Sequence, residues 1–320
     1  MPVSTIHIGE EASKDRTSIR SFHHSSYPAA RIAAERAERR LGVSVCLPAR
    51  ECAETVGEIV TVLGELQTAG LIDEIVVVDA GSADGTAEVA ERAGAAVRQE
   101  AELMPSYGPV LGKGDAMWRA LSVLEGELVC FLDADTQGFS PHFLTGLLGP
   151  LVCEADVSLV KGFYRRPIAT GGSPDVNGGG LDADGGGRVN HLMARPALEL
   201  FYPELASVRQ PLAGEVAARR ELLARLPFAT GYGVEIAMLI DAWREVGLDE
   251  IVQVDLEEHR NRHQPLSALT PMALTVLATI ARRLERDGRL MAPPAAAGAP
   301  GGEASHAPLE RPPLAELRVA

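Results

Sequence analysis

Two aspartates directly follow a short apolar run in the stretch LVCFLDADTQG, which covers residues 128–138. The apolar run predicts a buried strand, and the alternation of side chains along a strand would send Asp133 and Asp135 to the same side. Two carboxylates at the end of a buried strand suit a hard divalent cation such as Mg²⁺, which binds phosphate oxygens beside a few protein ligands. The same pattern also occurs at ordinary polar strand ends, so the neighbouring elements must decide between these interpretations.

The segments around this motif alternate between strand-like and helix-like patterns. Strands are expected at 43–50, 75–78 and 127–132, and helices at 54–70, 84–93 and 113–124. This alternation predicts an α/β fold of βαβ units, with a Rossmann-like, mostly parallel sheet and helices on both faces. Ligands of such sheets bind at the carboxyl ends of the strands. The polar stretches LPARE, VDAGSADG and LDADT all lie at such ends, which favours a ligand site there.

The second half of the chain carries further elements and one glycine-rich stretch. Helices are expected over 188–201, 233–247 and 267–288, and a strand in EIVQVDLEEH. The glycine-rich stretch 169–187 predicts a flexible loop. It contains a second Asp-Ala-Asp copy, but this copy follows glycines instead of a strand, so we do not expect it to hold a ligand rigidly.

Composition argues against several classes of protein. The 320 residues carry a formal net charge of -14, whereas nucleic-acid-binding proteins normally present a basic face. The polar N-terminus is not typical of a secretory signal, and no run reaches the roughly 18 apolar residues of a membrane helix. The cysteines show no CxxC spacing, which favours reduced thiols and a cytoplasmic protein. Two basic clusters, 161–167 and 259–263, could bind small anions or be solvated surface charge.

Two further motifs lie at expected strand ends or helix starts. Asp79 ends the apolar part of VVVDAGSADGT, where it could accept hydrogen bonds from a nucleobase while Gly81 allows close approach. The alternative is a turn in which an aspartate side chain caps the next helix. Lys113 stands between two glycines at the start of an expected helix, and a helix N-terminus with an ammonium group forms an anion site. The spacing does not match the P-loop pattern.

These motifs, in this order, resemble the nucleotide-sugar-dependent glycosyltransferases with the A-type fold. The resemblance is closer to the glucosyl- and mannosyl-3-phosphoglycerate synthases of actinobacterial type and spans about 43–270. The segments that carry it are LPAR, VVVDAGSADGT, GKGDAMWRAL, FLDADT, LVKGFYRRP, GGGRVNHLMARP, QPLAGEVAARRELL and FATGYGVEIAMLID. It implies a retaining transfer of glucose or mannose from a nucleoside diphosphate sugar to the 2-hydroxyl of 3-phosphoglycerate, with Mg²⁺ or Mn²⁺ as cofactor. Such a product would serve compatible-solute or polysaccharide-precursor synthesis.

The resemblance also implies the site residues. The nucleotide-sugar pocket would comprise Pro48, Ala49, Arg50, Glu51, Asp79, Gly81, Lys113, Asp133, Ala134, Leu212, Tyr232 and Glu235. The acceptor pocket would comprise Arg166, Gly187, Arg188, Asn190 and Arg262. The metal would bind Asp135 and either His259, favoured by alignment through HRNR, or His263, favoured by counting from the preceding strand and preferred here. The catalytic residues would be Lys113, Asp135 and Glu235.

The sequence departs from the family pattern after LPAR, where Cys52 replaces a usual acidic residue and leaves Glu51 as a neighbouring substitute. The carboxylates that motifs place as candidate nucleophiles are Glu215 and Glu235, but the resemblance favours a reaction without a covalent intermediate. In that reaction the departing phosphate helps to deprotonate the acceptor.

Other functions remain open at this point. A sugar-nucleotide pyrophosphorylase would need a glycine-rich, arginine-containing loop after the first strand, and LPARECAET does not supply one. A non-catalytic nucleotide-binding protein is the alternative from another class. An inverting polysaccharide synthase is disfavoured because no membrane segment is expected.

The expected organisation has four parts. Residues 1–42 form an N-terminal extension with a helix over 28–42, and 43–160 form the nucleotide-sugar-binding half. Residues 161–290 form the acceptor-binding half with the C-terminal helix, and 291–320 form a disordered tail. The apolar helix near 267–283 could support a homodimer or belong to the core.

Overall fold

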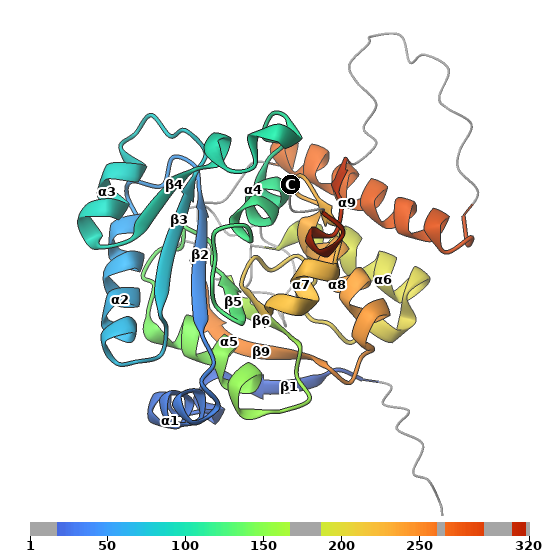
Figure 1. Cartoon of the computed structure of the whole chain (residues 1–320). Coiled ribbons are helices and arrows are strands. Elements are labelled where there is room, and N and C mark those ends of the chain that lie inside the picture. Colours follow the sequence, from blue (N-terminus) through green and yellow to red (C-terminus); the bar gives the residue numbers. More distant parts are fainter. Residues whose placement is uncertain (1–17, 167–186, 261–265, 291–308, 318–320) are drawn as a thin grey trace, which may run out of the picture.

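A central sheet of eight strands organises the chain (Figure 1). The computed structural model describes residues 18–166, 187–260, 266–290 and 309–317. The strand order in the sheet is β1-β9-β6-β7-β5-β2-β3-β4. The strands are β1 Arg20–His23, β2 Val43–Ala49, β3 Glu74–Asp79, β4 Ala96–Gln99, β5 Leu128–Phe131, β6 Leu159–Arg165, β7 Val216–Arg219 and β9 Ile251–Glu258. β7 runs antiparallel to β5 and β6, and the other pairings are parallel, which confirms the predicted mostly parallel sheet.

Helices cover both faces of this sheet, as the alternation of segments predicted (Figure 1). They are α1 Ala29–Arg39, α2 Val56–Thr68, α3 Thr86–Ala93, α4 Lys113–Ala120, α5 Pro141–Cys153, α6 Arg195–Phe201, α7 Arg220–Arg225, α8 Val234–Val246 and α9 Leu266–Arg286. Side chains of β2 alternate between two hydrophobic clusters: Val45 and Leu47 pack with α2 and α5, whereas Cys46 packs with α4 and α8. Successive strand residues point to opposite faces, so β2 is buried on both sides, whereas the edge strands β1 and β4 keep exposed residues.

The motif that opened the sequence analysis lies at the end of β5, but not inside it. The strand ends at Phe131, so Asp133 and Asp135 lie in the turn that follows. The expectation that strand alternation orients them is therefore wrong. The turn, held in part by Thr136 Oγ1 donating to the Asp133 carbonyl at 3.0 Å, positions the two carboxylates instead.

The N-terminal region contains a strand that the sequence analysis did not predict. β1 lies at the edge of the main sheet and pairs in parallel with β9, with Arg20 opposite Val252. The predicted helix over 28–42 is present as α1, and its C-cap is Arg40 in the left-handed conformation instead of Gly42. Part of the predicted extension therefore belongs to the central sheet.

The prediction of a disordered tail is wrong for residues 309–317, here called the C-terminal strap. Within it, β10 (Glu310–Arg311) pairs antiparallel with β8 (Phe228–Ala229). Glu310 forms ion pairs with three arginines of α9, and Trp118 Nε1 of α4 donates to the Pro312 carbonyl at 2.9 Å. These partners are distant in sequence, so the composition of the tail could not indicate them. Residues 291–308 and 318–320 lie outside the described residues.

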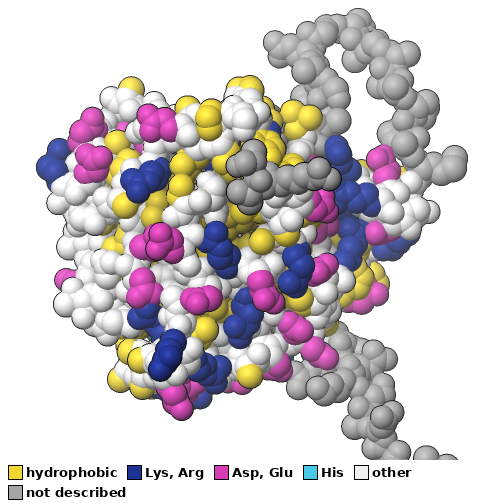
Figure 2. Space-filling model, in the orientation of Figure 1, with side chains coloured by type: hydrophobic (Ala, Val, Ile, Leu, Met, Phe, Trp, Pro, Cys, Tyr) yellow, Lys and Arg dark blue, Asp and Glu magenta, His cyan; other side chains and the backbone are white. Residues whose placement is uncertain are grey.

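The surface charges, the cysteines and the helices can be compared with what the composition predicted. Lys and Arg side chains alternate with Asp and Glu over much of the face shown in Figure 2. All four cysteines are free and buried. Among the described residues, no helix is both long enough and apolar enough to cross a membrane.

Candidate active site

A cavity of about 860 Å³ opens at the carboxyl ends of β2, β3 and β5, where the sequence placed its polar motifs. The start of α4, the start of α8 and the first half of α9 complete its walls. The predicted site residues that line it are Pro48, Ala49, Arg50, Glu51, Lys113, Asp133, Ala134, Asp135, Arg166, Gly187, Arg188, Asn190, Leu212, Tyr232 and Glu235. The fold thus brings most of the predicted donor residues and most of the predicted acceptor residues into one cavity.

Other predicted residues lie behind the wall or outside the described residues. Asp79 is buried, and its Oδ2 accepts hydrogen bonds from the backbone N–H groups of Gly81 and Ser82, both at 3.1 Å. This is the aspartate turn that the sequence offered as the alternative, but it does not cap α3, whose N-cap is Gly85 without a side-chain cap. Asp79 Oδ1 is buried and makes no hydrogen bond within the described part of the chain, so it keeps an unused acceptor. Arg262 and His263 lie outside the described residues, as does the Asp-Ala-Asp copy at 182–184.

Lys113 connects the two carboxylates that flank it in the cavity. Its Nζ lies 2.6 Å from Asp133 Oδ1 and 3.0 Å from Glu235 Oε1. Burial alone would lower the pKa of Lys113, but the negative charges of Asp133 and Glu235 outweigh this and hold it well above its ordinary value. The lysine therefore carries a positive charge at the first turn of α4.

A second group of side chains surrounds Asp133 on its other side. Asp133, Glu215 and His259 each offer a ligand atom, and these atoms lie within 4.8 Å of one another. Glu215 and His259 are buried, with His259 Nε2 2.8 Å from Glu215 Oε1. The His259 ring stacks on Tyr164, and Thr136 Oγ1 lies 3.0 Å from its Nε2. Thr136 and Tyr164 thereby fix the orientation of the imidazole.

Charges in this group fit a divalent cation. Burial would raise the pKa of Glu215, but His259 lowers it to about 2, so Glu215 stays ionised. The concave wall removes water from Asp135, and this burial together with the charge of Asp133 raises the pKa of Asp135, although Lys113 acts in the opposite direction. Several carboxylates thus share a small volume. Oxygen ligands with one imidazole suit Mg²⁺ or Mn²⁺.

Gly214 is a residue of this site that the sequence analysis did not single out. It precedes β7 and lines the cavity beside Asp133. A Cβ at this position would overlap the Asp133 carboxylate. The only sequence signal was its place inside the motif QPLAGEV, which gives no indication of the close approach.

The basic side chains of the predicted cluster at 161–167 lie in three different environments. Lys161 is buried and donates to the Ala213 carbonyl, and burial lowers its pKa to about 8. Arg165 is exposed and pairs with Glu258. Arg166 lines the cavity and donates to Tyr164 Oη at 2.9 Å. Of these three side chains, Arg166 is the one that can meet an anion in the cavity.

Comparisons with known proteins identify the family of this chain. The model of the family described as glycosyl transferase family 2 matches residues 44–174. The glucosyl-3-phosphoglycerate synthase of Mycolicibacterium smegmatis is 44% identical over 82% of this chain and 84% of its own length. That of Petrotoga mobilis is 40% identical over 87% of this chain and 84% of its own length.

Solved structures give the same result. The mannosyl-3-phosphoglycerate synthase of Rubrobacter xylanophilus has a TM-score of 0.82 and 44% identity, covering 93% of this chain and 96% of that one. The glucosyl-3-phosphoglycerate synthase of Mycobacterium tuberculosis, in complex with Mn²⁺, UDP-glucose and phosphoglyceric acid, has a TM-score of 0.77 and 36% identity, covering 94% and 99%. The chain belongs to the family of glucosyl- and mannosyl-3-phosphoglycerate synthases.

Proposed function

We propose that this chain transfers a hexose from a nucleoside diphosphate sugar to the 2-hydroxyl of 3-phosphoglycerate, with retention of configuration. The observation that carries the proposal is one cavity lined by Lys113, by the carboxylates of Asp133 and Asp135, and by the arginines Arg166 and Arg188. The first two would meet a donor diphosphate with its cation, and the arginines would meet an anionic acceptor. A relative crystallised with Mn²⁺, UDP-glucose and phosphoglyceric acid supports the pairing of these ligands.

The donor end requires positive charge near a leaving diphosphate. Asp135 and His259, with Asp133 and Glu215, would hold Mg²⁺ or Mn²⁺. His259 is proposed in place of His263, which the sequence analysis preferred and which lies outside the described residues. The cation would supply charge neutralisation at the phosphate oxygens. Lys113 adds a fixed ammonium group at the N-terminus of α4, where backbone N–H groups also favour an anion. Pro48, Ala49, Arg50 and Glu51 would line the nucleoside end, with Asp79 behind them.

The acceptor end is assigned to Arg166, Arg188 and Asn190. A guanidinium group suits a carboxylate or a phosphate because it can donate two parallel hydrogen bonds. Asn190 is buried, and its Oδ1 accepts a hydrogen bond from the Leu212 N–H at 3.0 Å. This contact joins the start of the acceptor segment to Leu212 on the donor side. The contribution of Arg262 stays a prediction.

The two candidate nucleophiles support a reaction without a covalent intermediate. Glu235 Oε1 lies 3.0 Å from Lys113 Nζ, and Glu215 is buried beside His259. The ammonium group of Lys113 holds Glu235, and Glu215 would be a ligand of the cation, so neither carboxylate is free to act as a nucleophile. A departing phosphate oxygen on the same face of the sugar would then accept the proton of the acceptor hydroxyl. Glu235 would position Lys113 and the sugar.

Neither alternative function gains a specific observation. Family membership favours transfer over a sugar-nucleotide pyrophosphorylase, and the assembled charged groups speak against a non-catalytic binding protein. A homodimer and a cytoplasmic location are further predictions. Leu274 and Leu277 of α9 are each 45% exposed, which is compatible with a helix face that pairs, and sedimentation at micromolar concentration would test it.

The product and its configuration test the proposal directly. The purified protein is incubated with 3-phosphoglycerate, Mg²⁺ and either UDP-glucose or GDP-mannose, and the product is examined by NMR. We expect an α-linked hexosyl-3-phosphoglycerate, because the donor sugars are α-linked and the transfer is retaining. A β-linked product would contradict the retaining mechanism, and the absence of any hexosylated product with both donors would contradict the transferase. The donor with the higher kcat/KM identifies the hexose.

A further inference from the structure

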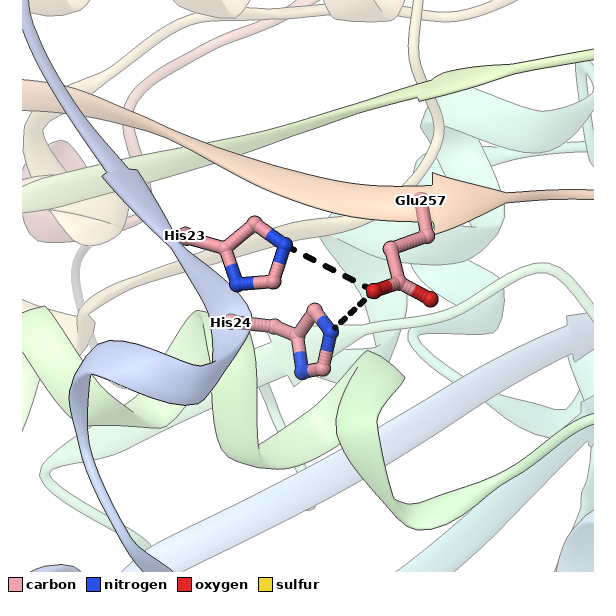
Figure 3. Close-up of side chains that lie close together, drawn as sticks. All are labelled: His23, His24 and Glu257. Atoms are coloured by element: carbon pink, nitrogen blue, oxygen red, sulfur yellow. Dashed lines mark ion pairs between the residues drawn. The ribbon is translucent and has the colours of Figure 1, made fainter.

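Three potential metal ligands meet where the end of β1 lies beside β9 (Figure 3). His23 ends β1, His24 begins the short 3₁₀ helix η1 (His24–Ser26), and Glu257 lies near the end of β9. We propose that these three side chains form a second metal site, which binds a divalent transition-metal ion such as Zn²⁺. None of the three lines the cavity described above.

The geometry carries this proposal. Glu257 Oε1 lies 3.1 Å from His24 Nε2 and 3.6 Å from His23 Nε2, and the candidate ligand atoms all lie within 4.8 Å of one another. Ligand atoms around a tetrahedral Zn²⁺ with bonds of about 2.0–2.1 Å are separated by about 3.3–3.4 Å. Small side-chain rotations would therefore place the three atoms around one ion. Figure 3 shows both imidazole rings directed toward the same carboxylate oxygen.

The ligand chemistry selects the kind of ion. Two imidazoles and one carboxylate match the three protein ligands of many zinc sites, in which a fourth position holds water. Imidazole nitrogen favours zinc, nickel and copper over magnesium and calcium, which prefer oxygen. This set thus differs from the oxygen-rich group around Asp133, and the two sites would prefer different ions.

The surroundings of the imidazoles agree with a ligand role. His24 Nε2 is buried and faces Glu257 Oε1 at 3.1 Å. His23 Nδ1 lies 2.7 Å from Ser25 Oγ and 3.3 Å from the Ser25 backbone N. When Nε2 binds a metal, Nδ1 carries the proton and donates a hydrogen bond to Ser25 Oγ, as zinc-binding histidines commonly do to an outer partner.

A third imidazole, that of His142, packs against the cluster without being available as a ligand. Its ring lies 4.7 Å from that of His24. Its Nε2 lies 3.0 Å from the Leu256 carbonyl, and its Nδ1 lies beside Ser140 Oγ. The metal set therefore consists of His23, His24 and Glu257.

An ion at this site would connect the end of β1 to the end of β9. Glu257 has a φ of +64° and its N–H donates to Asp255 Oδ1 at 2.9 Å. It stands two residues before His259, which belongs to the group around Asp133. A bound ion would hold the chain around Glu257 in place and stabilise the β1 edge of the sheet.

The test compares two neighbouring glutamates of β9 in the full chain. Glu257→Gln removes a proposed ligand, whereas Glu258→Gln changes a neighbour that pairs with arginines. Zn²⁺ is titrated in competition with a chromophoric chelator. With the cavity site weakened by Asp135→Ala, we expect one tight equivalent in the parent protein and in Glu258→Gln, and at least tenfold weaker binding of that equivalent in Glu257→Gln.

His24→Gln is the second variant, and both variants are measured in an Asp135→Ala background to weaken the cavity site. Circular dichroism at each step verifies that the variants are folded. Equal Zn²⁺ affinity in Glu257→Gln, His24→Gln and Glu258→Gln would overturn the proposal. The result does not depend on hexosyl transfer, because the readout is Zn²⁺ binding.

Discussion

Lys113 Nζ lies 2.6 Å from Asp133 Oδ1 at the point where α4 begins and the turn after β5 enters the cavity. This ion pair joins the helix N-terminus to the acidic group that would hold the cation. Glu235 lies on the other side of the same ammonium group, at 3.0 Å. Lys113 is therefore placed to stabilise negative charge on a departing diphosphate.

The first prediction concerns this ammonium group. Lys113→Met should lower kcat by about 10²–10³, the usual effect of removing one group that stabilises transition-state charge. The exposed Arg92→Met is the matched control, since it removes a cation far from the cavity. Steady-state release of nucleoside diphosphate measures both. A Lys113→Met enzyme with the kcat of the Arg92→Met control would show that the lysine has no catalytic role.

The second prediction concerns the space beside Asp133. Gly214→Ala should displace the Asp133 carboxylate, because the new Cβ would overlap it, and should reduce kcat at least tenfold. Gly64→Ala in α2 is the control, since nothing lies within 4 Å of its added Cβ. This control should keep its activity and gain roughly 0.5–1 kcal/mol of stability from better helix propensity. Equal activity of the two variants would contradict the described contact.

The third prediction concerns the C-terminal strap. Arg283 is fully buried between Asp241 and Glu310, with Nη1 2.5 Å from Glu310 Oε1. Glu310→Gln leaves this buried charge with one carboxylate, and should lower the free energy of unfolding by about 2–4 kcal/mol. Urea denaturation measures this change in the free energy of unfolding, and the exposed Glu316→Gln of the same strap is the control. A change below about 0.5 kcal/mol would mean that the strap does not hold α9.

The fourth prediction concerns a buried carboxyl group in the cavity wall. Burial, reinforced by Asp115, raises the pKa of Glu100 from 4.5 to about 7. The folded state thus keeps a proton that the unfolded state releases, so this group costs stability as the pH rises through this interval. The difference in free energy of unfolding between Glu100→Gln and the unchanged protein should therefore grow by about 2 kcal/mol, in favour of the variant, from pH 5 to pH 8.

Chemical denaturation at both pH values measures this gain, and the exposed Glu102→Gln is the control. A stability difference between Glu100→Gln and the unchanged protein that stays constant from pH 5 to pH 8 would exclude the raised pKa. A change in packing would alter stability equally at both pH values, so the difference between pH 5 and pH 8 reports the titration of Glu100.

The sequence was sufficient for those elements whose pattern is local. The strands expected at 43–50 and 75–78 are found at Val43–Ala49 and Glu74–Asp79, and the helix expected at 54–70 at Val56–Thr68. Apolar runs followed by polar turns define these elements within a few residues of chain. β1, β7 and β10 are short, and each depends on pairing with a strand distant in the sequence, which no local pattern records.

The residues of the candidate site also divide into those that a local pattern predicts and those that depend on contacts between distant segments. Lys113 and Asp133 were found because each stands directly at the end of a periodic element. The role of Glu215 beside His259 depends on β7 lying antiparallel between β5 and β6, so the sequence offered Glu215 only as a candidate nucleophile. Gly214 and Thr136 act through close contacts that appear only after folding.

One measurement tests the central claim most directly. Release of nucleoside diphosphate is followed with and without 3-phosphoglycerate and Mg²⁺, for the unchanged protein, for Asp135→Ala and for the surface control Asp156→Ala. The proposed function predicts release that requires the acceptor and the cation, that survives in Asp156→Ala, and that falls by at least 10²-fold in Asp135→Ala. Release that is independent of 3-phosphoglycerate, or equal in Asp135→Ala and Asp156→Ala, would contradict the proposed site and reaction.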